Sequence, residues 1–191
     1  RSPESTSVAR AAAQARKLTL TTEVLSGAAF VEIIRCSRRI GADLIVLGRH
    51  GRRGVRDKFI GTTTERVIRK GDVPVLAVNM KPVHPYRRPL IATDLEDSAP
   101  GVVDLALRVV GQETERVSAV HAVHVPFEGF VTPVLARTED SSYRRSFKDE
   151  AKVSLAKLLS RYMDVGVRWK AAVRAGDARS VVLAEAVRSE E

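Results

Sequence analysis

The sequence predicts an α/β fold with a mostly parallel sheet, because short apolar strands alternate with amphipathic helices along most of the chain. The run Leu44–Leu47 is apolar at every position, which is typical of a strand that helices cover on both faces. The segment Ala28–Ile40 instead places its large apolar residues three and four positions apart, as an amphipathic helix does. Apolar residues make up 44% of the chain and aromatic residues only 5%, which favours an α/β protein over an all-β one.

The N-terminal part of the chain contains six expected elements. Gly41 follows the helical pattern at 28–40 and is expected to end that helix. Thr62-x-x-Glu65 is a capping box that opens a further helix, and Gly71 ends it. In chain order we expect a helix at 7–17, a strand at 18–24, a helix at 28–40, a strand at 44–47, a helix at 62–70 and a strand at 75–78.

The pattern starts again after a short segment rich in proline. We interpret residues 81–86 as a linker, so that the domains are 1–80 and 87–191. The second part is expected to hold strands at 89–93, 117–125 and 167–173, helices at 102–110, 143–163 and 178–187, and a loop at 127–142.

An internal repeat supports this division. Residues 24–29 and 173–178 share the pattern Val-x-x-Gly-x-Ala, so the second copy follows the first by 149 positions (173 − 24). The pairs Ile34 with Leu183 and Arg39 with Arg188 keep the same offset. Because the order helix, strand, helix also repeats, the sequence predicts two incomplete copies of one unit.

Three glycines after the buried strand suit a phosphate-binding loop. Gly48, Gly51 and Gly61 stand between the strand at 44–47 and the helix at 62–70. Glycine permits positive φ and close approach of an anion, and the following helix directs its free N–H groups toward the same place. No glycine precedes a lysine, which excludes a Walker loop, and the spacing is not that of a dinucleotide fingerprint. The alternative is a turn that uses glycine only for its geometry.

The motif Gly48-x-x-Gly51-x9-Gly61-Thr62 resembles the ATP-binding signature of universal stress proteins at every specified position. The resemblance implies a Rossmann-like, adenine-nucleotide α-hydrolase-like sandwich with strand order 3-2-1-4-5. Residues 1–80 resemble the second half of such a domain and residues 87–191 the first half of the next, in a tandem arrangement. Three arrangements stay open: the chain is a portion of a longer tandem protein, a permuted single domain, or one of two chains that exchange halves.

The resemblance also implies which residues bind the nucleotide. Asp94 would accept a hydrogen bond from the adenine amino group or a ribose hydroxyl, and Thr62 would donate to phosphate or cap its helix. The two groups form one site only if the two halves combine. The phosphate group comprises Leu47, Gly48, Gly51, Gly61, Thr62 and Thr63, and the adenosine group comprises Ala92, Thr93, Asp94 and the pair His124-Val125.

The resemblance implies a regulatory module that binds ATP, with magnesium left open, and reports nucleotide state through dimerisation or a protein partner. No evident catalytic base stands beside the loop, so any ATP hydrolysis or self-phosphorylation would be slow. One alternative is a dimeric scaffold of the same fold that binds no nucleotide. Another is an adenylating enzyme, because residues 94–98 partly resemble a pyrophosphate loop, although both of its glycines are missing.

Charge and composition indicate which classes of ligand and which compartment suit the protein. The formal net charge is +9, and the densest basic cluster, Arg49–Lys58, lies within the glycine motif, where it suits a triphosphate. No aromatic residues interleave with it, which disfavours nucleic acid. No apolar run is long enough to span a membrane, and the single cysteine, Cys36, forms no internal disulfide, so we expect a cytoplasmic protein. The four histidines have no metal-ligand spacing.

Overall fold

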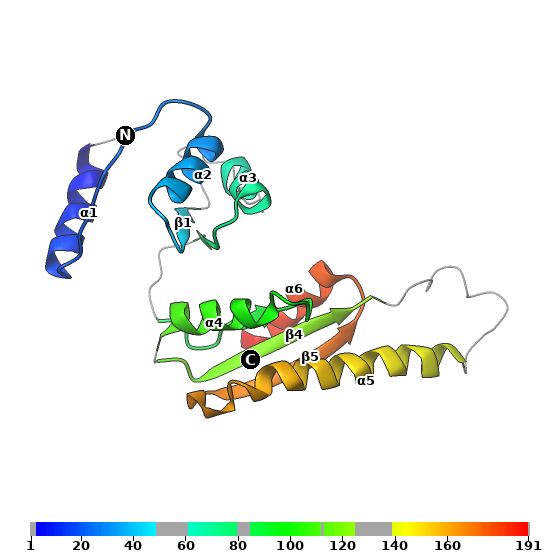
Figure 1. Ribbon diagram of the computed structural model, residues 1–191. Coiled ribbons are helices and arrows are strands. Elements are labelled where there is room, and N and C mark those ends of the chain that lie inside the picture. The colour runs from blue at the N-terminus through cyan, green and yellow to red at the C-terminus, as the bar shows by residue number, and fades with distance from the viewer. Residues whose placement is uncertain (1–2, 49–60, 80–84, 112, 125–138, 191) are drawn as a thin grey trace. The chain divides into compact units, whose positions relative to one another are not determined.

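The computed structural model of the 191-residue chain describes residues 3–48, 61–79, 85–111, 113–124 and 139–190. These residues belong to two compact units, Arg1–Lys81 and Pro82–Glu191 (Figure 1). The expected linker at 81–86 lies largely outside the described residues. Among the residues that the structure describes, no helix combines the length and apolar character that crossing a lipid bilayer requires.

The N-terminal unit contains a small parallel sheet beside a pair of helices. β1 pairs in parallel with β2, with Ile45 opposite Val75 and Gly48 opposite Val78. Helices α2 and α3 contact each other, and their apolar faces meet the sheet in a core formed by Ile34, Ile45 and Val67. The elements are α1 (Pro3–Ala15), α2 (Ala29–Arg39), β1 (Ile45–Gly48), α3 (Thr62–Lys70) and β2 (Val75–Val78).

The prediction of a strand at 18–24 is wrong, because this segment has no regular secondary structure. A strand is stable only where a neighbouring strand satisfies its backbone groups, and none of the described strands pairs with this segment. Its apolar side chains are also uncovered by the described residues, with Val24 87% exposed. Alternation of apolar and polar residues therefore predicted a strand where no described partner strand is present.

The start of α3 differs by one residue from the expected capping box. Gly61 is the N-cap residue, Thr62 is the first helical residue, and within the described part of the chain no side chain caps the helix. The N–H of Glu65 donates to the carbonyl of Gly61 at 3.0 Å, and the Glu65 carboxylate accepts from Arg69 at 3.1 Å instead of reaching back to the helix start. The expected role of Thr62 as the cap is thus wrong.

The C-terminal unit is a three-stranded parallel sheet in the order β3-β4-β5. Parallel neighbours need a crossover connection, which α4 and α5 supply. The elements are β3 (Leu90–Ala92), α4 (Ala99–Val110), β4 (Arg116–Val123), α5 (Glu139–Ser160), a 3-10 turn (Met163–Val165), β5 (Arg168–Ala175) and α6 (Ala178–Glu190). Helix α4 thus begins three residues before the expected position, and α5 already includes residues 139–142, which were expected to be loop.

The sheet separates two helical layers. Alternate residues of β4 point to opposite faces, and Val117 and Ala119 pack against residues of α4 and α5. Arg116, on the other face, donates to the carbonyl of Ser189 in α6 at 3.1 Å. Helices α4 and α5 therefore cover one face and α6 the other (Figure 1). This arrangement confirms the expected parallel α/β class.

Candidate functional site

The first candidate group lies where β1 ends and α3 begins. Leu47 and Gly48 are the last two residues of β1, Gly61 precedes α3, and Thr62 and Thr63 open the helix. Gly51 and the basic cluster at 49–58 lie outside the described residues. The structure therefore places both ends of the glycine motif at a strand-to-helix connection, as the sequence predicted.

The first turn of α3 leaves backbone donors without a side-chain partner. The first N–H groups of any helix have no intrahelical acceptor, and no side chain of the described residues caps this helix. The positive end of the helix dipole lies at the same point. Thr62 is exposed and Thr63 half-buried, so both hydroxyl groups lie near the surface. This geometry favours an anion in front of α3.

Gly48 has no conformational need to be glycine. It is not among the glycines with positive φ, and Gly61 has a φ of −55°. A Cβ built on Gly48 would meet nothing within 4 Å among the described residues. The expectation that positive φ explains these two glycines is therefore wrong. The remaining explanation for glycine at position 48 is that the missing side chain leaves room beside the backbone at the end of β1.

The second candidate group forms a tight turn after β3. The N–H of Thr93 donates to the carbonyl of Val120 in β4 at 3.1 Å, which continues the sheet by one residue. Thr93 Oγ1 accepts from the N–H of Leu95 at 3.1 Å. The exposed carboxylate of Asp94 accepts from the N–H of Glu96 through Oδ1 at 3.1 Å. Ala92, Thr93 and Asp94 thus form one ordered turn, in which Asp94 Oδ2 accepts no hydrogen bond from the described residues.

Leu95 adopts a backbone conformation that is rare for leucine, with a φ of 67°. Its side chain packs against core residues that include Ala119 and Val123. Packing of an apolar side chain thus stabilises a left-handed residue at the carboxyl end of β3, beside the candidate adenosine residues. Strain of this kind is often found at ligand sites.

His121 is a site residue that sequence reasoning did not select. Its Nδ1 donates to the carbonyl of Thr93 at 2.8 Å. Because a carbonyl oxygen only accepts, Nδ1 carries a proton, and in the neutral ring Nε2 remains an acceptor. The sequence showed a histidine in a strand but not its contact with the turn. His124 follows β4 and is exposed, whereas Val125 lies outside the described residues.

The carboxyl ends of β4 and β5 complete this edge of the sheet. The N–H of Gly176 donates to the carbonyl of Val123 at 3.1 Å. Asp177 caps α6, accepting from the backbone N–H of Ser180 at 2.9 Å and from its hydroxyl at 3.0 Å. The backbone hydrogen bond is the main cause that lowers the pKa of the Asp177 carboxyl. Ligands of parallel α/β sheets bind at this carboxyl edge.

The structure thus brings the predicted residues together as two groups, each within its own unit. Leu47, Gly48, Gly61, Thr62 and Thr63 belong to the N-terminal unit, and Ala92, Thr93 and Asp94 to the C-terminal unit. Within the described ranges, no three His, Cys, Asp or Glu side chains are grouped as metal ligands.

Comparison with known sequences identifies relatives of the N-terminal unit. Residues 2–79 match the model of the Universal stress protein family. Universal stress protein MJ0577 of Methanocaldococcus jannaschii is 34% identical over 58 residues, which are 30% of this chain and 36% of that protein. Universal stress protein Slr1230 of Synechocystis is 40% identical over 57 residues, or 30% of this chain and 20% of that protein. The chain thus spans about a third or less of these relatives.

Solved structures resemble the whole chain. A putative universal stress protein from Pseudomonas aeruginosa has a TM-score of 0.65 at 13% identity, covering 100% of this chain and 66% of that one. A universal stress protein from Archaeoglobus fulgidus has a TM-score of 0.61 at 19% identity, covering 97% of this chain and 61% of that one. At these identities the likeness shows the fold alone.

Proposed function

We propose, from the match of residues 2–79 to the model of the universal stress protein family, that the protein is a stress-response module that binds ATP. The match to the family model supports the stress-response part of this proposal. Binding of an adenine nucleotide is the further step, and magnesium would accompany the triphosphate as it does in many nucleotide sites.

One observation carries the nucleotide proposal. A strand ends at Gly48, where a Cβ would meet none of the described residues within 4 Å. The next described residues, from Gly61, open a helix whose first N–H groups have no side-chain cap among the described residues. A triphosphate in front of α3 would accept from these N–H groups and meet the positive end of the helix dipole. The basic residues at 49–58 would add charge of the opposite sign to the phosphates.

The adenosine part of the proposal rests on the turn after β3. Asp94 has an exposed carboxylate with one oxygen engaged, so the other would accept from an adenine amino group or a ribose hydroxyl. His121 and Thr93 hold this turn in place. This contribution requires an N-terminal and a C-terminal unit to act together, from one chain or from two.

Gly61→Asp tests the nucleotide proposal without weakening the helix. Aspartate is a favoured N-cap residue, and the backbone of Gly61 lies outside the left-handed region, so α3 should keep its stability. The new carboxylate would occupy the first N–H groups and repel phosphate. We expect ATP affinity, measured by calorimetry, to fall by about tenfold or more, equivalent to about 1.4 kcal/mol.

Gly41→Asp is the matched control. It adds the same charge in the same unit, at the C-terminal end of α2, where φ is 61° and a Cβ would meet none of the described residues within 4 Å. Aspartate tolerates this left-handed conformation better than most residues. ATP affinity should be unchanged in this variant. Equal affinity of wild type and Gly61→Asp, or equal losses in both variants, would contradict phosphate binding at α3.

A second candidate function, a self-associating scaffold that binds no nucleotide, is favoured by the uncovered apolar residues Leu18, Leu20 and Val24. Exposed apolar clusters of this kind often become buried in an interface between copies. A stable homodimer by light scattering, with no thermal shift from any nucleotide, would favour the scaffold over the ATP module.

A further inference from the structure

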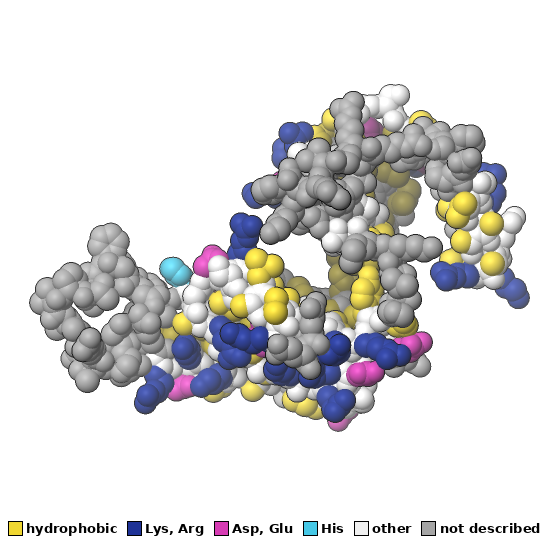
Figure 2. Space-filling model, turned by 180° about the vertical axis from the view of Figure 1, so that it is seen from behind, with side chains coloured by type: hydrophobic (Ala, Val, Ile, Leu, Met, Phe, Trp, Pro, Cys, Tyr) yellow, Lys and Arg dark blue, Asp and Glu magenta, His cyan; other side chains and the backbone are white. Residues whose placement is uncertain are grey.

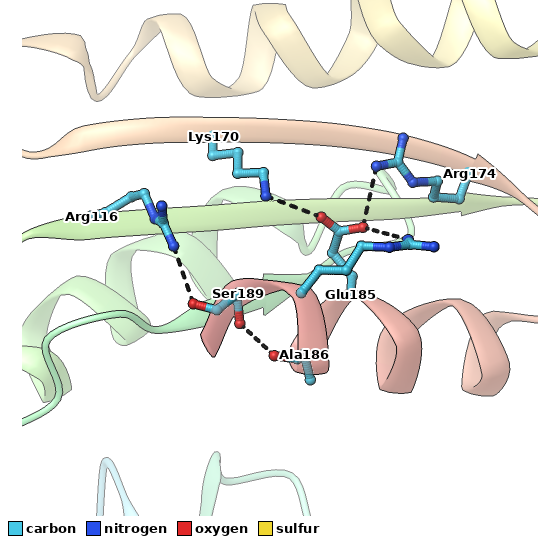
Figure 3. A network of polar contacts seen from close by, with 7 residues as sticks. Arg116, Lys170, Arg174, Glu185, Ala186 and Ser189 are labelled. Carbon is cyan, nitrogen blue, oxygen red and sulfur yellow. Dashed lines mark hydrogen bonds and ion pairs between the residues drawn. The ribbon is translucent and has the colours of Figure 1, made fainter. Parts of the chain in front are cut away.

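A group of charged side chains lies between β5 and α6, apart from both candidate nucleotide groups. Glu185 of α6 is surrounded by three cations (Figure 3). The Lys170 Nζ lies 3.7 Å from Oε1, and Arg174 Nη2 and Arg188 Nη1 each lie 3.3 Å from Oε2. We call these four residues the Glu185 cluster.

Burial divides the cluster into an inner anion and outer cations. Glu185 is 1% exposed, whereas the side chains of Lys170, Arg174 and Arg188 are 41–55% exposed. A buried carboxylate is costly unless cations pair with it, and here it also holds together three cations that would otherwise repel one another. The buried Glu185 carboxylate thus anchors three cations whose positive charge faces solvent.

The charges of the cluster do not balance. Three cations meet one carboxylate, which leaves a surplus of two positive charges. Among the described residues, these cations form no ion pair with any other acidic side chain. Arg116 adds a further positive charge nearby, bound to the carbonyl of Ser189. Figure 2 shows Lys and Arg side chains gathered over the visible face of the C-terminal unit.

The hydrogen bonds of the cluster are also incomplete. Glu185 Oε1 and Arg116 Nε are buried and have no hydrogen-bond partner among the residues that the structure describes. The distances of 3.3–3.7 Å exceed the length of about 2.8 Å typical of charge-assisted hydrogen bonds. A guanidinium group carries five N–H donors, so Arg174 and Arg188 retain most of theirs for another acceptor.

The equivalent positions of the other sequence copy show that the fold does not require this cluster. At the offset of 149 positions, Glu185 corresponds to Cys36, Lys170 to Thr21 and Arg174 to Leu25. Helix α2 nevertheless forms, with the equivalent Arg39 bound to Glu23 instead. Since the same helix is built without the cluster, its charges call for another explanation.

We propose that the Glu185 cluster binds a phosphate group, with Lys170, Arg174 and Arg188 donating to its oxygens and Glu185 positioning them. A phosphate dianion matches the surplus charge, and its tetrahedral oxygens accept from several donors at once. Each arginine guanidinium can donate two parallel hydrogen bonds to a pair of phosphate oxygens. This site is separate from the proposed ATP site, since it uses no residue of the glycine motif.

Titration of the full chain with inorganic phosphate, followed by the amide NMR signals of β5 and α6, tests the proposal. Wild type should show saturable shifts there, and Arg174→Gln should weaken binding by about tenfold or more, the loss expected for one charged hydrogen bond. Arg161→Gln is the charge-matched control, because Arg161 is exposed and follows α5, which covers the other face of the sheet. It should bind phosphate as wild type does.

Lys170→Gln provides a second variant should Arg174→Gln fail to fold, and it should also weaken binding. Gly61→Asp should leave phosphate binding at α6 intact, so failure of the ATP proposal and failure of this one are distinguishable. Equal losses in Arg174→Gln and Arg161→Gln, or no saturable shift in β5 and α6, would overturn the proposal. A competition experiment with a single-stranded oligonucleotide provides a further test. The proposal would also be overturned if the oligonucleotide displaced the phosphate and bound equally well to wild type and Arg174→Gln.

Discussion

Replacement of Leu155 by alanine tests whether α5 anchors the C-terminal unit. Leu155 is 1% exposed and packs in one cluster with Ala119 of β4 and Leu159 of its own helix. Trp169 and Val173 of β5 lie against the same cluster. The side chain thus joins α5 to two neighbouring strands, and its truncation should weaken the whole unit.

The expected loss follows from this burial. Leu155→Ala removes the side-chain groups beyond Cβ, and at about 0.8 kcal/mol for each of about three groups the lost burial amounts to about 2.4 kcal/mol. Rigid strands on one side allow little collapse, so the residual cavity raises the loss in unfolding free energy to about 3–4 kcal/mol. This is a large part of the stability of an ordinary domain.

Urea unfolding followed by tryptophan fluorescence measures this loss. The chain has a single tryptophan, Trp169, which lies beside Leu155, so the signal reports the C-terminal unit. Val153→Ala is the control, because Val153 lies on the same helix and is 68% exposed, and its change should stay within about 0.5 kcal/mol. A loss below about 1 kcal/mol for Leu155→Ala, or equal losses in both variants, would refute the packing of α5 described here.

Two further predictions concern backbone conformation and pH. Gly176→Ala should destabilise the protein by about 1–2 kcal/mol because φ is 134°. Gly101 lies within α4, and a Cβ there would meet none of the described residues within 4 Å, so Gly101→Ala should stabilise the protein by about 0.5–1 kcal/mol. Urea midpoints of equal sign for the two variants would contradict this. Burial raises the pKa of Tyr162 above its usual 10.0, and its hydroxyl donates to the carbonyl of Pro100 at 3.1 Å. Stability from the neutral phenol is therefore present below pH 10.0 and lost as pH rises through the raised pKa. Tyr162→Phe should remove that alkaline loss, and an identical pH slope of unfolding free energy in both proteins would disprove it.

Local signals predicted most of the fold. The helix expected at 28–40 occupies 29–39, and the strand expected at 44–47 occupies 45–48, because periodicity and a flanking glycine are properties of the segment itself. The segment 18–24 failed because a strand depends on a partner, which its own alternation does not reveal. The cap at Thr62 failed because Gly61 already serves as the N-cap.

The candidate site was only partly predictable for a similar reason. Gly48 and Gly61 could be found by spacing, since both lie in one short stretch of sequence. The hydrogen bond from His121 to Thr93 joins residues of different strands, and the left-handed backbone of Leu95 depends on the core around it. The Glu185 cluster contains residues of β5 and of α6. They lie close together only because α6 packs back against the sheet, which the local sequence does not reveal.

The two glycines of the internal repeat show how little the backbone alone says about chemistry. Gly27 and Gly176 have φ values of 138° and 134°, and a helix begins two residues after each, at Ala29 and Ala178. One of these helices carries a cysteine where the other carries a buried glutamate with three cations. The same local geometry therefore supports two different surfaces. Similarity of fold to solved structures at 13–19% identity does not identify a ligand either. A ligand has to be inferred from the side chains and the backbone donors of the site.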